Sequence, residues 1–176
     1  MLIGAGCATV KARELVFLYE STVDTTMLDG SAPPLRVTFW LDSELPTGTG
    51  PIGPNPPSST GYGPVNMLIR LGDETVVGTG GGITVFNNAG TTFVEDCFDV
   101  RPSAIAGSLY GRVVIFFRIL LVDKDCDMLF SDTTLPTDPN FAIATDFQQV
   151  SINLGLSVNP DIREFTNTPA EELTPL

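Results

Sequence analysis

Hydrophobic and polar residues alternate along much of this chain with a period of two, which is the spacing of a β-strand. The alternation is clearest in Leu35–Asp42, Val65–Leu71 and Asp146–Val158. Because successive side chains of a strand point to opposite faces, each segment is expected to bury one face and expose the other. Shorter segments of the same kind are Glu14–Glu20, Thr75–Val77, Ile83–Phe86 and Thr91–Val100.

One segment, Leu109–Val122, is apolar on both parities and is interrupted only by Arg112 and Arg118. Its β-branched and aromatic residues favour a strand, and the absence of a polar face predicts that both faces are covered. A membrane-spanning helix is disfavoured, because the segment is shorter than about 20 residues and contains Arg118. A buried helix is the alternative for so short an apolar run. We therefore expect this segment to be the central strand of the core.

The remaining segments are rich in proline and glycine. Residues 43–64 carry six prolines, so regular structure is not expected to continue through them. Residues 161–176 are acidic and contain proline, and we expect an extended C-terminal arm. The pattern predicts an all-β chain: a single antiparallel β-sandwich or jelly roll of about eight strands over residues 1–160, with the Pro/Gly-rich loop 43–64 inserted. A closed β-barrel is the second choice.

Composition limits the classes of partner. The chain has 176 residues, of which 43% are hydrophobic and 17% charged, which suits one folded domain. Nine Lys and Arg residues stand against 21 Asp and Glu residues, giving a net charge of −12. Phosphate backbones and anionic membrane surfaces require clustered basic residues, so neither nucleic acid binding nor membrane insertion is expected.

The chain contains no histidine, which removes Ser-His-Asp and Cys-His catalysis and His-ligated metals. We therefore expect that the protein is not an enzyme. Its three cysteines form no CxxC pair. Cys97 lies in a predicted strand and Cys126 follows the central one, so the two form a disulfide if those strands are neighbours. The alternative is two buried thiols.

Three alternate carboxylates, Asp123, Asp125 and Asp127, directly follow the central strand. In an extended backbone they emerge on one face, and Ca²⁺ prefers such oxygen ligands. The EF-hand pattern does not fit, and a solvated acidic loop end is the alternative interpretation. We expect no other cofactor.

Other residues are candidates for contacts of different kinds. Arg118, if buried, needs a carboxylate partner, and Glu95 or Asp99 on a neighbouring strand can supply it. Glu95 and Asp99 also share a strand face, and a pair of carboxylates can catalyse glycoside hydrolysis, but such pairs arise by chance in an acidic β-protein. Trp40 and Tyr62 are candidate stacking surfaces for a ligand.

We recognise no family motif in the chain. The absence of catalytic groups, the long loop and the terminal arm favour a structural subunit that self-assembles, in a virion, a phage tail or an extracellular filament. Its partners are then copies of itself or other structural subunits. The alternative is an extracellular module that binds carbohydrate or a small ligand. An extracellular or virion location is expected, with the cytoplasm as the alternative; Met1–Val10 lacks the basic region of a signal peptide.

Overall fold

The computed structural model describes residues 15–23, 25, 30–41, 46–51, 58–89, 95–124, 134–136, 147–155, 161–166 and 172–175. These residues contain β-strands and no helix. The strands are β1 (Leu15–Thr22), β2 (Pro34–Leu41), β3 (Pro46–Pro51), β4 (Ser58–Tyr62), β5 (Val65–Leu71), β6 (Glu74–Gly80), β7 (Gly82–Ala89), β8 (Glu95–Arg101), β9 (Ala104–Ala106), β10 (Ser108–Leu109), β11 (Arg112–Asp123), β12 (Phe147–Leu154), β13 (Asp161–Thr166) and β14 (Glu172–Pro175).

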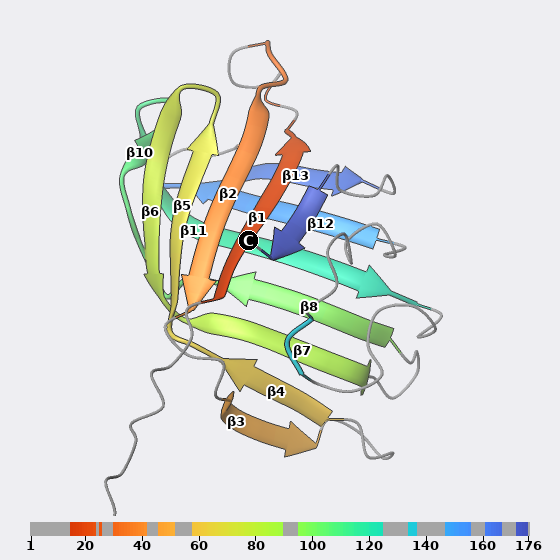
Figure 1. Ribbon diagram of the computed structural model, residues 1–176. Coiled ribbons are helices and arrows are strands. Elements are labelled where there is room, and N and C mark those ends of the chain that lie inside the picture. Colours follow the sequence, from red (N-terminus) through yellow and green to blue (C-terminus); the bar gives the residue numbers. More distant parts are fainter. Residues whose placement is uncertain are drawn as a thin grey trace, which may run out of the picture.

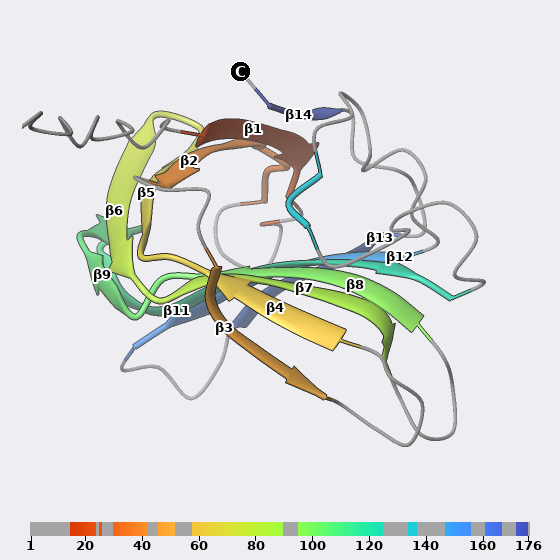
Figure 2. The same ribbon diagram turned by 60° about the horizontal axis from the view of Figure 1, so that its bottom comes forward.

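The strands form two antiparallel sheets. The small sheet has the order β14-β1-β2-β5-β6-β9, and the large sheet has the order β13-β12-β11-β8-β7-β4-β3, with β10 paired to β11. The strands of the small sheet run across those of the large one, and the small sheet arches over the large one as a second layer (Figures 1 and 2). The predicted β-sandwich is confirmed. The described strands form two open sheets rather than one closed barrel.

The core lies between the two sheets and is built from alternate residues of each strand. In β2, Val37 and Phe39 are fully buried. Phe17 of β1 stacks on Phe39 with ring centroids 5.1 Å apart and also meets Phe98 of the large sheet at 6.2 Å. The contact between Phe17 and Phe98 joins the two layers, and the burial of these rings follows from the alternation in the sequence.

The central strand was predicted to be covered on both faces, and this is wrong for its first part. Val113 and Ile115 are 56% and 65% exposed, whereas Val114 is buried. A β-bulge between Val114 and Phe116 adds one residue to β11, so that Val114 and Phe117 both face the core. Simple alternation in the sequence does not reveal this bulge. After the bulge, the residues of β11 switch faces relative to those before it.

The inserted loop 43–64 was expected to lack strands, and this is also wrong. Residues 46–51 and 58–62 form the antiparallel pair β3–β4, which extends the large sheet through β7. Pro46 and Pro51 lie at the two ends of β3, an edge strand, where proline is tolerated because no inner ladder hydrogen bond is lost. Such short strands also explain why about eight strands were too few.

The predicted C-terminal arm contributes to both sheets. Strand β13 pairs with β12, and β14 pairs with β1. The division of the chain at residue 160 stays a prediction, but the described parts of the arm are edge strands of the sandwich.

The chain crosses from the small sheet to the large one at a glycine cluster between β6 and β7. Gly80 and Gly81 have positive φ values of 70° and 65°, a conformation that disfavours residues with a Cβ atom. A Cβ on Gly82 would overlap the carbonyl oxygen of Tyr62. The glycines therefore allow a close approach of three backbone segments at the point where β7 begins between β4 and β8.

Candidate functional site

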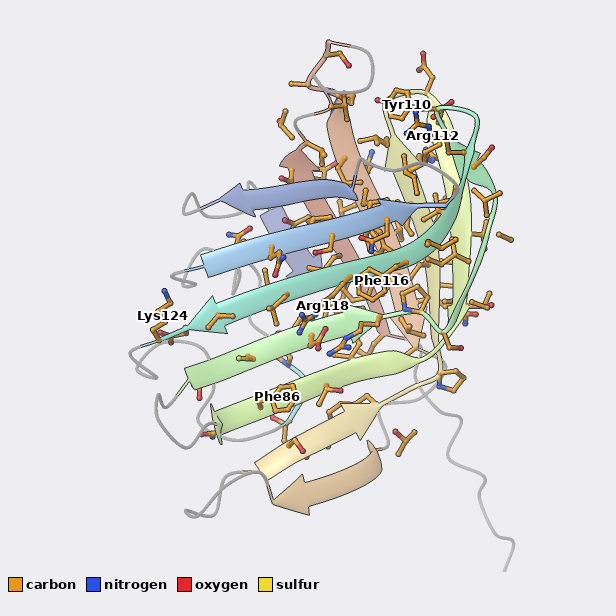
Figure 3. All side chains as sticks on the ribbon, turned by 180° about the vertical axis from the view of Figure 1, so that it is seen from behind. Phe86, Tyr110, Arg112, Phe116, Arg118 and Lys124 are labelled. Carbon is orange, nitrogen blue, oxygen red and sulfur yellow. The ribbon has the colours of Figure 1, made fainter. Side chains whose placement is uncertain are left out.

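The outer face of the large sheet carries the polar residues that point away from the core. One row of cross-strand neighbours runs through β4, β7, β8, β11 and β12, namely Gly61, Thr84, Asp99, Leu120 and Gln149. Figure 3 views the molecule from this side, with Phe116 and Arg118 on β11 and Phe86 on β7. The alternation of β8 explains the row, because Phe98 and Val100 fill the core and leave Asp99 on the outside.

Asp99 is the centre of an ion cluster on this face. Although it points away from the core, its side chain is only 3% exposed, because it lies between two arginines. Arg118 donates from Nε to Oδ1 at 2.9 Å and from Nη2 to Oδ2 at 2.9 Å, a two-pronged pair. Arg101 donates from Nε to both carboxylate oxygens at 3.0 Å and from Nη2 to Oδ2. We call these three residues the Asp99 cluster.

The titration of the cluster follows from these contacts. Burial raises the pKa of Asp99, but the hydrogen bonds from Arg101 and Arg118 outweigh it and hold this pKa below its ordinary value of 3.8. The hydrogen bond to Asp99 raises the pKa of Arg101. Asp99 is therefore ionised at neutral pH, and the cluster carries two positive charges and one negative charge.

The prediction that Arg118 lies within salt-bridge range of an acidic residue is confirmed, with Asp99 as the partner. Glu95 was the other candidate. The register places Asp96 opposite Asp123, so the backbone of Glu95 lies beyond that pair, at the far end of β11 from Arg118. The side chain of Glu95 lies outside the described residues.

A hollow of about 430 Å³ opens beside the Asp99 cluster. It lies where β4, β7 and β8 meet, and Arg101 and Asp99 form part of its wall. Gly61 and Gly82 occupy outward-facing positions there, so the sheet has no side chains that would fill the space. The other lining residues are Thr47, Tyr62, Gly81, Ile83, Thr84, Pro102 and Ser103. We call this space the glycine hollow.

Arg112, at the start of β11, has no partner of the kind that Arg118 has. Its Nη1 atom is buried, and within the described part of the chain it makes no hydrogen bond. Figure 3 shows Arg112 beside Tyr110 at the corner of the two sheets, far from Arg118 along β11. The backbone N–H of Tyr110 donates to Oε2 of Glu74 at 2.6 Å.

The predicted calcium ligands are only partly described. Asp123 is buried at the end of β11, and its cross-strand neighbour Asp96 is buried as well. Asp125 and Asp127 lie outside the described residues, so the calcium site stays a prediction. Within the described ranges, no three His, Cys, Asp or Glu side chains gather into a metal-binding group.

The other candidate residues lie apart from one another. Cys97 is half-buried on β8, whereas Cys126 lies outside the described residues, and their disulfide stays a prediction. Trp40 is half-buried on β2 of the small sheet, and Tyr62 is buried on β4 of the large sheet. These two rings therefore belong to different sheets and do not form one stacking surface.

Sequence reasoning did not identify Arg101 or the glycine hollow. Arg101 stands two residues after Asp99, which puts both on the same face of a strand, and this spacing is a signal that was available. The hollow depends on Gly61 and Gly82 facing outward on neighbouring strands, which only the strand pairing shows.

Comparison with known proteins gives no relative: no family model, curated protein or solved structure matches this chain. Over the part of the chain that the structure describes, no helix has the length and hydropathy to cross a membrane.

Proposed function

We propose that this protein is a structural subunit that self-assembles. The observation that carries the proposal is the gathering of exposed apolar side chains at the corner where the sheets meet. Val77, Val113 and Ile115 are the large hydrophobic residues that are exposed among those described, at 42%, 56% and 65%. We call them the corner residues.

Strand pairing connects Val77 with Val113, and Ile115 stands two residues after Val113 on β11, with the buried Val114 between them. Val77 of β6 stands opposite Ala106 of β9, and two residues later Ser108 of β10 stands opposite Val113 of β11. Ala106 and Ser108 are exposed as well, so small side chains separate the large ones. Exposed apolar side chains that lie together can form part of a protein–protein contact.

The open sheets offer a second means of association. Strands β3 and β13 are the edges of the large sheet, and β9 and β14 are the edges of the small one. An edge strand has unpaired backbone groups that a strand from another copy can bind. Two of these edges come from the predicted C-terminal arm, which is the segment we expected to mediate assembly.

Sedimentation velocity over a range of protein concentrations tests the proposal. We expect the mass to rise with concentration, and we expect Ile115→Glu to weaken association by about tenfold to a hundredfold, since burying such a side chain is worth about 1.5–3 kcal/mol. Thr22→Glu is the matched control, because it adds the same charge at an exposed position of β1, across the small sheet from β6. A protein that stays monomeric at all concentrations, or equal effects of the two variants, would contradict the proposal.

A second candidate function, a module that binds a small ligand, is favoured by the glycine hollow. Its volume of about 430 Å³ falls within the range of about 300–1,000 Å³ that is usual for ligand sites. This function does not depend on Trp40 and Tyr62 acting together, because the polar groups around the hollow supply the contacts.

A further inference from the structure

We propose that the glycine hollow binds a small oxyanion, a carboxylate or a phosphate group, through the guanidinium of Arg101. This inference rests on the second candidate function and names its class of ligand. It does not depend on self-assembly.

The first argument is the charge of the Asp99 cluster. Arg118 alone satisfies Asp99, because its two hydrogen bonds of 2.9 Å engage both carboxylate oxygens. Arg101 is therefore not needed to neutralise Asp99, and the cluster keeps one positive charge in excess. Of the cluster, Asp99 and Arg101 line the hollow, and Arg118 lies behind Asp99. In a chain with a net charge of −12, an excess positive charge beside a hollow is a feature that stability does not require.

The second argument is the free donor capacity of Arg101. A guanidinium has five N–H donors, and Asp99 takes those of Nε and Nη2 that point toward it. The Arg101 guanidinium makes no other hydrogen bond to the described residues. Its side chain is 51% exposed and lines the hollow, so the donors of Nη1 remain for a ligand. Asp99 holds the Arg101 side chain in place, which lowers the entropy that a ligand must offset.

The third argument is the shape and lining of the hollow. Gly61 and Gly82 leave backbone at its floor, and Gly82 cannot gain a side chain without overlap with Tyr62. Thr47 and Thr84, whose side chains carry hydroxyl groups, are among the residues that line the hollow. An arginine beside hydroxyl and backbone groups suits an oxygen-rich anion, which accepts hydrogen bonds from all of them.

A second hollow, of about 420 Å³, provides the comparison that the test needs. It lies on the small sheet and is lined by Glu20, Arg36 and Arg70, whose charges sum to one positive charge, as do those of the Asp99 cluster beside the glycine hollow. There the carboxylate is itself accessible, since Glu20 is 34% exposed and Arg36 54% exposed. Water screens such a surface pair, so simple charge attraction at an arginine is expected to be weak here.

The experiment is an NMR titration of the ¹⁵N-labelled chain at constant ionic strength with inorganic phosphate, with acetate and with glucose. We expect saturable shifts of the Gly61 and Gly82 amides and of the Arg101 Nε–H with phosphate, acetate or both, which tells the two anion sources apart. Arg101→Gln should weaken this binding by about tenfold or more, as loss of a charge-assisted hydrogen bond predicts. Arg36→Gln, the control of similar exposure, should leave the binding unchanged.

The outcomes separate the two levels of the proposal. If glucose gives the saturable shifts and the anions do not, the oxyanion assignment is overturned and the ligand-binding function stands. If no probe gives saturable shifts at the hollow, both are overturned. Shifts that Arg36→Gln reduces as much as Arg101→Gln would show general charge attraction and would also overturn the assignment. The amide spectrum of each variant reports whether it is folded.

Discussion

Replacement of Asp99 by asparagine is the most direct test of the ion cluster on the large sheet. Asparagine keeps the size of the side chain but removes the charge that lies between Arg101 and Arg118. The loss of one partner of a buried ion pair costs about 3–5 kcal/mol. Arg118 is 27% exposed, so water solvates part of the charge that is left. We therefore expect Asp99→Asn to lower the free energy of unfolding at pH 7 by about 2–4 kcal/mol.

The assay is thermal and urea unfolding followed by circular dichroism. For a chain of this length, about 3 kcal/mol corresponds to a decrease in Tm of about 6–12 °C. Asp73→Asn, in the exposed turn between β5 and β6, removes the same charge and should change stability by less than about 0.5 kcal/mol. Arg118→Met in the Asp99→Asn background should recover part of the loss, because it removes a charge that has no partner.

The dependence on pH gives an independent check. The pKa of Asp99 is lower in the folded chain than its ordinary value of 3.8. The unfolded chain therefore binds a proton at Asp99 first, so the stabilisation is complete above the unfolded pKa and is lost as the pH falls through the folded pKa. The difference in stability between the wild-type protein and Asp99→Asn should be constant near neutral pH and should shrink below about pH 4. A difference under about 0.5 kcal/mol at pH 7, or one that persists unchanged in acid, would refute the reasoning.

Three further predictions concern other sites. Arg112→Met should leave the free energy of unfolding unchanged or raise it by about 1 kcal/mol in urea unfolding, because it removes a buried nitrogen without a hydrogen bond; a clear loss would mean that Nη1 has a partner. Gly82→Ala should destabilise by about 1–3 kcal/mol, whereas Gly155→Ala, where the new Cβ meets the exposed Ile115 side chain at 3.1 Å and the Val113 oxygen at an ordinary 3.6 Å, should cost less; equal effects would contradict the close approach. If the predicted calcium site exists, Ca²⁺ at about 100 times its Kd should stabilise the chain by about 2.7 kcal/mol relative to EDTA, and Asp123→Asn should remove the effect; an unchanged Tm would count against the site.

The layers of the fold follow from the alternation of the sequence, and particular residues show why. Val37 and Phe39 alternate with polar neighbours, and both are buried as predicted. A period of two is sufficient to predict which residues are buried here, because the pairing of β1, β2 and β5 is regular.

The errors come from features that the period does not record. The bulge at Ile115 exchanges the faces of β11, and nothing in the run of apolar residues marks it. Pro46 and Pro51 were taken as strand breakers, but an edge position removes the cost of a missing N–H. A sequence pattern reports which residues prefer burial, whereas register and edge position depend on partners that are distant in the chain.

The candidate site was predictable in part for the same reason. The need of Arg118 for a carboxylate follows from its place in an apolar strand, and the sequence limited the choice to Glu95 or Asp99. The choice between them required the pairing of β8 with β11. The second arginine, Arg101, follows Asp99 by two residues on the same strand, so its place beside Asp99 was open to prediction from the sequence.

The glycine crossing between β6 and β7 has a practical consequence for anyone who modifies this chain. It joins the two layers without spare length, since Gly81 and Gly82 are in contact with the backbone of Arg101 and Tyr62. An epitope or reporter peptide grafted there would push the layers apart. The tight turn at Gly72 and Asp73 is exposed and leads out of and back into the same sheet, which makes it the better place for such a graft.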